Sequence, residues 1–87
     1  MANKRTLKKA INLICEDLFA DGIAVALYGP RPKSEVEDLL YSIVKLQNNY
    51  ITRVSHPEPG MIAKVYFKDL WEKFCAEVGE IQDQLQA

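Results

Sequence analysis

The stretch Phe67–Leu85, FKDLWEKFCAEVGEIQDQL, decides the fold class of this chain. Its apolar residues recur in steps of three, one, three, four, three and four, which places all of them on one side of a helix with 3.6 residues per turn. These residues are Phe67, Leu70, Trp71, Phe74, Val78, Ile81 and Leu85. The opposite side carries the charged residues Lys64, Lys68, Glu72, Glu80 and Asp83. An apolar stripe this wide needs other helices to cover it, so we expect an all-α fold.

Two further helices are predicted upstream, separated by connections that contain proline. We expect helices at about residues 4–28, 34–55 and 60–85, because Gly29–Pro32 and Pro57–Gly60 interrupt the helical periodicity. In the first helix the apolar residues Leu7, Ile11, Ile14 and Leu18 step by four, three and four. Long helices joined by short connections predict an antiparallel helical bundle, formed by a single domain over residues 1–87.

The second half of the first helix allows more than one interpretation. Phe19, Ile23 and Leu27 continue its apolar pattern on a neighbouring stripe. Gly22 interrupts the pattern and weakens a helix by about 1 kcal/mol relative to Ala. We expect either a kink near Gly22 or a close approach of another helix at this point. A β-strand over residues 23–28 is the alternative, although no pairing strand is evident.

Three residues are predicted to define where the helices begin. Ser34 is followed three residues later by Glu37, which is the pattern of a capping box. Asn3 is suited to cap the first helix, and Pro59 is suited to the first position of the third helix.

The composition is that of an ordinary globular protein. The 87 residues are 48% apolar and 26% charged, and the net charge is −1, which does not attract nucleic acid or an anionic membrane over a distance. Cys15 and Cys75 lie beside apolar stripes, where we expect each to pack as a small hydrophobic residue in a reducing compartment. Glu16 and Asp17 interrupt the first apolar stretch, so no secretion signal is expected. The longest uninterrupted apolar run, Ile23–Tyr28, is far shorter than the roughly 20 residues needed to span a membrane. These features predict a cytoplasmic protein that does not bind membranes.

No set of residues predicts a catalytic or metal site. His56 is the only histidine, and together with Glu58 it could form a His–carboxylate pair for proton transfer. A metal site needs three or four ligands, however, and a helix-terminal loop residue is the simpler interpretation of His56. We therefore expect no enzyme activity, no cofactor and no metal.

Nucleic-acid binding is an alternative hypothesis based on the basic start of the chain. Lys4, Arg5, Lys8 and Lys9 cover one side of the first helical turns and could contact phosphates. The stretch Gln47–Arg53 is the other polar segment suited to such a role, but the second helix begins with acidic residues that would repel DNA.

Protein–protein interaction is the function that the sequence favours. Apolar and aromatic residues lie beyond the main stripes, so a three-helix bundle would leave some of them uncovered. The candidate interface residues are Tyr28, Ile51, Tyr66 and Trp71. Trp71 belongs to the stripe and is either core or interface, whereas Tyr66 lies beside it. A homodimer or another protein partner would cover these residues.

The stretch Leu7–Ala20, LKKAINLICEDLFA, resembles small uncharacterised all-helical bacterial proteins. The similarity covers about the first quarter of the chain. It implies a helical fold and assigns no activity and no functional residues.

Overall fold

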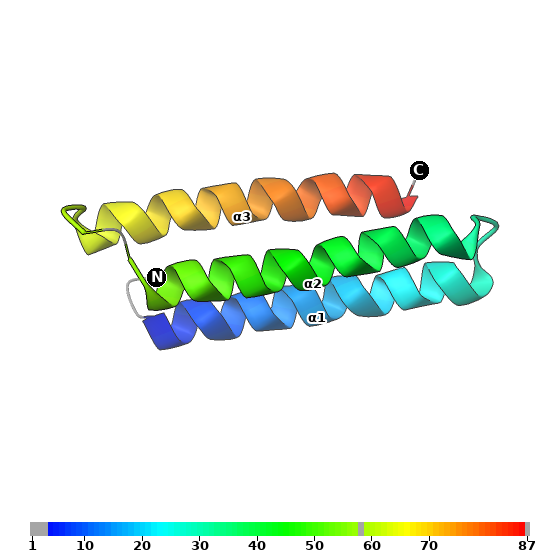
Figure 1. Ribbon diagram of the computed structural model, residues 1–87, viewed down its shortest axis with the longest axis horizontal. Coiled ribbons are helices and arrows are strands. Elements are labelled where there is room, and N and C mark those ends of the chain that lie inside the picture. Colours follow the sequence, from blue (N-terminus) through cyan, green and yellow to red (C-terminus); the bar gives the residue numbers. More distant parts are fainter. Residues whose placement is uncertain (1–3, 58, 87) are drawn as a thin grey trace.

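In the computed structural model the chain forms three α-helices that lie side by side in antiparallel order (Figure 1). α1 spans Lys4–Tyr28, α2 spans Lys33–Ser55 and α3 spans Ala63–Gln86. The structure describes residues 4–57 and 59–86, so the predicted roles of Asn3 and Glu58 lie outside it. No β-strand occurs among the described residues. The predicted all-α bundle is confirmed, and the alternative of a strand over residues 23–28 is wrong.

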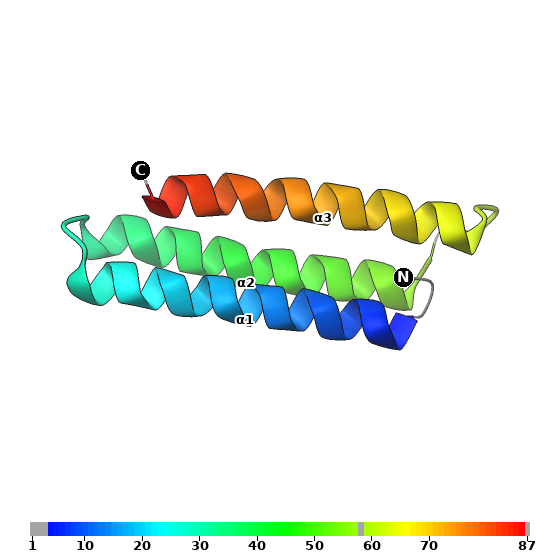
Figure 2. The same ribbon diagram turned by 180° about the vertical axis from the view of Figure 1, so that it is seen from behind.

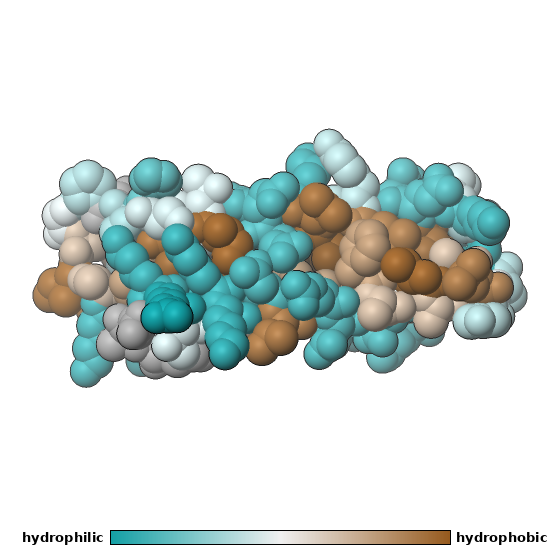
Figure 3. Space-filling model, turned by 90° about the horizontal axis from the view of Figure 1, so that it is seen from below, coloured by the Kyte–Doolittle hydropathy of each residue, from teal (hydrophilic) through white to brown (hydrophobic). Residues whose placement is uncertain are grey.

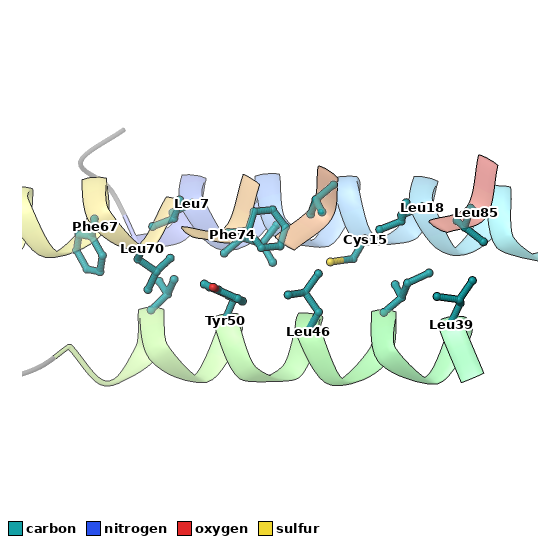
Figure 4. Close-up of a cluster of buried hydrophobic side chains, with 14 residues drawn as sticks. Leu7, Cys15, Leu18, Leu39, Leu46, Tyr50, Phe67, Leu70, Phe74 and Leu85 are labelled. Carbon is teal, nitrogen blue, oxygen red and sulfur yellow. The ribbon is translucent and has the colours of Figure 1, made fainter. Parts of the chain in front are cut away.

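One hydrophobic core runs along the length of the bundle, and its side chains point toward one another from all three helices (Figure 4). The buried members are Leu7, Ile11, Cys15 and Leu18 of α1, Leu39, Ile43, Leu46, Tyr50 and Val54 of α2, and Phe67, Leu70, Phe74, Val78 and Leu85 of α3. Trp71 and Ile81 are half-buried at its edge. The apolar stripe of the last helix therefore faces the core as predicted. Cys75, in contrast, is exposed, so its predicted packing as a small hydrophobic residue is wrong.

α1 packs more closely on α2 than on α3 (Figures 1 and 2). Gly22 makes this approach possible, because a Cβ atom at this position would lie only 2.6 Å from Cδ2 of Leu40 in α2. α1 is continuous through Gly22. The glycine thus serves the close approach that was one of its two predicted roles. α3 contributes the large rings of Phe67 and Phe74 to the core, and side chains of this size keep helix axes further apart.

The start of α2 differs from the prediction. The helix begins at Lys33, and the carbonyl oxygen of Pro32 accepts hydrogen bonds from the backbone N–H groups of Glu35 and Val36 at 3.2 and 3.4 Å. No side chain caps this end. The predicted capping box at Ser34 is therefore wrong, because Ser34 already lies inside the first helical turn.

α3 begins a few residues later than the predicted position near residue 60. Gly60 adopts a φ angle of 87° in the turn that precedes the helix, and this left-handed conformation is incompatible with a right-handed helix. The first backbone hydrogen bond at this end runs from the N–H of Tyr66 to the carbonyl oxygen of Ile62 at 3.0 Å.

Arg31 links the α1–α2 connection to the end of α3. Its Nη1 atom donates a hydrogen bond to the carbonyl oxygen of Gln84 in the last turn of α3, and its Nε atom lies 3.7 Å from a carboxylate oxygen of Glu35. A cation next to the last carbonyl groups of a helix interacts favourably with the helix dipole. Arg31 therefore links the start of α2 to the C-terminal end of α3.

Within residues 4–57 and 59–86, none of the helices has a segment with the length and hydropathy needed to cross a lipid bilayer.

The two glycines inside helices are expected to respond differently to substitution by alanine. A Cβ atom at Gly79 meets nothing within 4 Å, so Gly79→Ala should stabilise the protein by about 0.5–1 kcal/mol through helix propensity. Gly22→Ala should lack this gain, because Leu40 must move, and Gly22→Leu should destabilise by about 1–3 kcal/mol through overpacking. Urea unfolding followed by circular dichroism measures all three. A stable Gly22→Leu variant would contradict the close approach of α1 and α2.

Candidate interaction face on α1 and α2

Several large apolar side chains of α1 and α2 are exposed although they lie in the middle or second half of long helices. On these two helices they are Leu13, Ile23, Leu27, Tyr28, Tyr41 and Val44. Leu27 and Tyr41 are 62% and 66% exposed. Single exposed apolar residues are normal on a protein surface, so their arrangement decides whether they matter.

On α1 the exposed apolar residues follow a second helical stripe. Leu13 and Leu27 each lie seven residues from Ala20, and Ile23 lies between Ala20 and Leu27. Seven residues correspond to about two helical turns, so these side chains share one side of the helix. That side points away from the core, because the buried residues of α1 occupy other positions of the helical turn.

On α2 the neighbouring apolar residues lie on the side that faces α1. The amide of Gln47 donates a hydrogen bond to Oδ1 of Asn12 at 2.8 Å, and Leu40 approaches Gly22. These contacts fix the rotation of α2 about its own axis. Leu40, Val44 and Ile51 therefore lie along the side of α2 that is turned toward α1. Tyr41 lies next to Val44, three residues before it.

Together these residues form a largely apolar surface that we call the outer face. The exposed carboxylate of Glu16 interrupts it, because Glu16 lies on the same side of α1, three residues after Leu13 and four before Ala20. It comprises Leu13, Phe19, Ala20, Ile23, Leu27, Leu40, Tyr41, Val44 and Ile51. Phe19, Leu40 and Ile51 are half-buried against the core, and the other members are exposed. In the space-filling view, hydrophobic atoms cover much of the surface over the C-terminal half of α1 (Figure 3).

α3 does not cover the outer face, because it packs on the other side of both helices. The surface depression between α2 and α3 is lined by Lys45, Asn49 and Glu77, among others. The depression between α1 and α3 is lined by residues that include Val25 and Gln82. None of these residues belongs to the outer face.

The four predicted interface residues do not lie on one surface. Ile51 belongs to the outer face, whereas Tyr28 is 86% exposed at the end of α1. Tyr66 is half-buried, and its hydroxyl donates a hydrogen bond to the carbonyl oxygen of Arg53 at 3.0 Å. Trp71 is half-buried with its ring 5.6 Å from that of Phe74. Tyr66 and Trp71 flank the buried stripe of α3 on opposite sides and attach this helix to the core.

The sequence pattern placed Ile23 and Leu27 on a stripe next to the predicted core stripe of the first helix, and the structure shows that both are exposed. It did not single out Leu13 or Tyr41. The sequence signal for this surface is the seven-residue spacing of Leu13, Ala20 and Leu27. It marks a second row of apolar residues on a helix that already has a buried row.

The basic residues lie at the opposite end of α1 from Leu27. Lys4, Arg5 and Lys9 are exposed in the first two turns, and Lys8 is half-buried. The polar stretch Gln47–Arg53 has internal partners, since Gln47 is bonded to Asn12 and the guanidinium group of Arg53 lies 5.0 Å from the ring of Tyr50.

His56 is exposed at the end of α2, where its backbone N–H donates to the carbonyl oxygen of Thr52 at 3.0 Å. In the described part of the chain, no three His, Cys, Asp or Glu residues lie close enough together to hold a metal ion.

One polar pair joins α2 and α3 at the edge of the core, where the buried Tyr50 meets the exposed Glu77. The hydroxyl of Tyr50 donates a hydrogen bond to a carboxylate oxygen of Glu77. The ring of Tyr50 packs edge-on against that of Phe74, with the ring centroids 5.2 Å apart (Figure 4). Burial raises the pKa of Tyr50 to about 12, and the hydrogen bond to Glu77 adds to this effect. Burial also raises the pKa of the Cys15 thiol to about 11. Both groups are neutral near pH 7, which fits a structural role in the core.

Comparisons with known proteins gave no match: no family model fits the sequence, and no curated protein or solved structure is significantly similar to it.

The raised pKa of Tyr50 predicts a loss of stability at alkaline pH. The neutral phenol is the form that the folded state favours, so its contribution is complete below pH 10, the ordinary pKa, and is lost as the pH rises toward 12. Relative to Tyr50→Phe, the wild-type protein should lose about 1.4 kcal/mol of unfolding free energy by pH 11. Urea unfolding of both proteins from pH 8 to pH 11 measures this difference. Parallel pH profiles would show that the Tyr50 hydroxyl does not titrate in the folded state at a shifted pKa.

Proposed function

We propose that this chain is a cytoplasmic protein–protein interaction or assembly module that acts through the outer face of α1 and α2. The observation that carries the proposal is the group of exposed apolar side chains on the sides of α1 and α2 that α3 does not cover. Leu13, Ile23 and Leu27 of α1 and Tyr41 and Val44 of α2 are all exposed. Exposed apolar surface of this kind is typical of interaction sites in soluble proteins.

The outer face is well suited to bind another protein because it belongs to regular secondary structure. Its half-buried members Phe19, Leu40 and Ile51 pack against the core, so little conformational freedom is lost when a partner covers the surface. Burying apolar surface stabilises a complex by about 25 cal/mol per Å² before the entropy of association is subtracted. The unpaired thiols of Cys15 and Cys75 support a reducing compartment.

A photoreactive side chain tests this proposal in cells that express the chain. A benzophenone amino acid at Leu27 should form covalent protein adducts on irradiation, because a partner would cover this side chain. The same group at Lys68, which is exposed on α3, is the matched control and should form few adducts. Equal yields at the two positions, or none at Leu27, would overturn an interaction function for the outer face. The mass of the adduct identifies the partner.

Nucleic-acid binding remains the second proposal. It is supported by the exposure of Lys4 and Lys9 in the first turns of α1, where the positive end of the helix dipole also favours phosphate.

Neutralising the basic turns tests the second proposal. Electrophoretic mobility shifts with duplex and single-stranded DNA and RNA at low salt should decrease when Lys4, Arg5, Lys8 and Lys9 are all changed to Gln. Binding should also fall steeply with added salt, because contacts to phosphates release counterions. No shift at low salt with the wild-type protein would exclude this function.

A further inference from the structure

The outer stripe of α1 has an internal symmetry that suggests what covers it. Leu13 precedes Ala20 by seven residues, and Leu27 follows it by seven. A twofold axis through Ala20, perpendicular to the helix, would place Leu13 of one copy against Leu27 of a second copy, and Leu27 against Leu13. A twofold interface requires a surface that is complementary to itself in this way. Ala20 is small enough to let two helices approach at the axis.

We infer that the outer face is covered by a second copy of this chain, with the two α1 helices packed antiparallel about Ala20. This inference rests on the proposed interaction function and names the partner. In the resulting dimer, α1 of each copy lies between its own α2 and α1 of the other copy. Tyr41 and Val44 of α2 extend the interface beside the α1 pair.

The exposed surface area of the chain agrees with an interface of standard size on each copy. The protein exposes 5940 Å², whereas a compact monomer of its mass, 9.9 kDa, exposes about 5200 Å². The excess is about 700 Å², and a standard interface buries about 800 Å² on each partner. The excess arises because the bundle is long and thin, with extents of 47 × 18 × 16 Å. Covering the outer face would bring the exposed surface per chain near the usual value.

The charges on α1 favour the antiparallel arrangement over a parallel one. In a parallel pair, the basic first turns would lie side by side and Glu16 would face Glu16. In the antiparallel pair, Glu16 and Asp17 of one copy lie opposite Ala24 and Ile23 of the other, because each pair is equally distant from Ala20, so the carboxylates of the two copies do not face each other. The two Lys8 residues would then be roughly 36 Å apart at 1.5 Å per residue, well beyond the screening distance of about 8 Å at physiological salt.

Sedimentation equilibrium of the purified full-length chain tests whether a second copy binds. At about 100 µM the wild-type protein should be a dimer, since interfaces of standard size have micromolar or tighter affinity. Leu27→Glu should weaken association at least tenfold, because it places a carboxylate against Leu13 of the other copy. Ile62→Glu is the matched control, since Ile62 is 72% exposed and lies outside the outer face. It should leave the dimer unchanged.

Circular dichroism shows whether the variants keep their helices, which is expected because both side chains are exposed. A wild-type protein that stays monomeric at 100 µM, or a dimer that Leu27→Glu does not weaken, would overturn the inference. Where Leu27→Glu proves unfolded, Tyr41→Glu serves as the second variant on the same face, with the same expected loss of the dimer.

Disulfide trapping tests the orientation of the two helices. In a Cys75→Ser background, Ala20→Cys should give a covalent dimer with oxidised glutathione, because residue 20 of each copy lies at the twofold axis. Tyr28→Cys should give none, because its two Cα atoms would be roughly 24 Å apart at 1.5 Å per residue, too far for a disulfide. Cys15 is buried and does not compete. Efficient trapping at both positions would indicate a parallel pair and overturn the antiparallel arrangement.

The outcomes separate this inference from the proposed function. The purified protein could be monomeric while residue 27 still forms adducts with a different protein in cells. That result would refute a second copy as the partner and support the interaction function. A monomer without adducts at residue 27 would refute both.

Discussion

Burial of the α3 stripe between α1 and α2 is the interaction on which the rest of the structure depends. Phe67, Leu70 and Phe74 fill the space between the other two helices, and each fully buried side chain of this type contributes about 1.5–3 kcal/mol. A chain of this length has a small core, so losing the side chains of α3 would remove a large part of it. Once α1 and α2 turn their inner sides toward α3, their outer sides have no helix left to cover them.

The outer face is therefore a direct consequence of how three helices pack. Gly22 lets α1 approach Leu40 of α2 closely, which brings the apolar stripes of the two helices near each other. A larger residue at position 22 would move the helices, and with them the two stripes, apart. The same contact that stabilises the bundle thus also creates the interaction site that we propose, and the symmetry about Ala20 indicates a second copy of the chain as its partner.

The periodicity of the sequence was enough to predict the three helices within a few residues of their ends. It was less informative about the ends themselves, which depend on the conformation of single residues. Ser34 has the sequence pattern of a cap, yet the helix starts at Lys33, after Pro32. Gly60 delays α3 by taking a left-handed conformation. Local patterns describe what a residue can do, and the backbone path of the connection determines which option is used.

The sequence by itself determined the fold class, because spacings of three and four residues allow only one regular structure to gather the apolar residues on one side. Only the tertiary structure decided which apolar residues are core and which are surface. Ile23 and Leu27 have the same chemistry as Leu18, and their exposure follows from where α2 and α3 lie around α1. Periodicity gives the direction of a side chain relative to its own helix, whereas burial depends on which side of that helix a neighbour occupies.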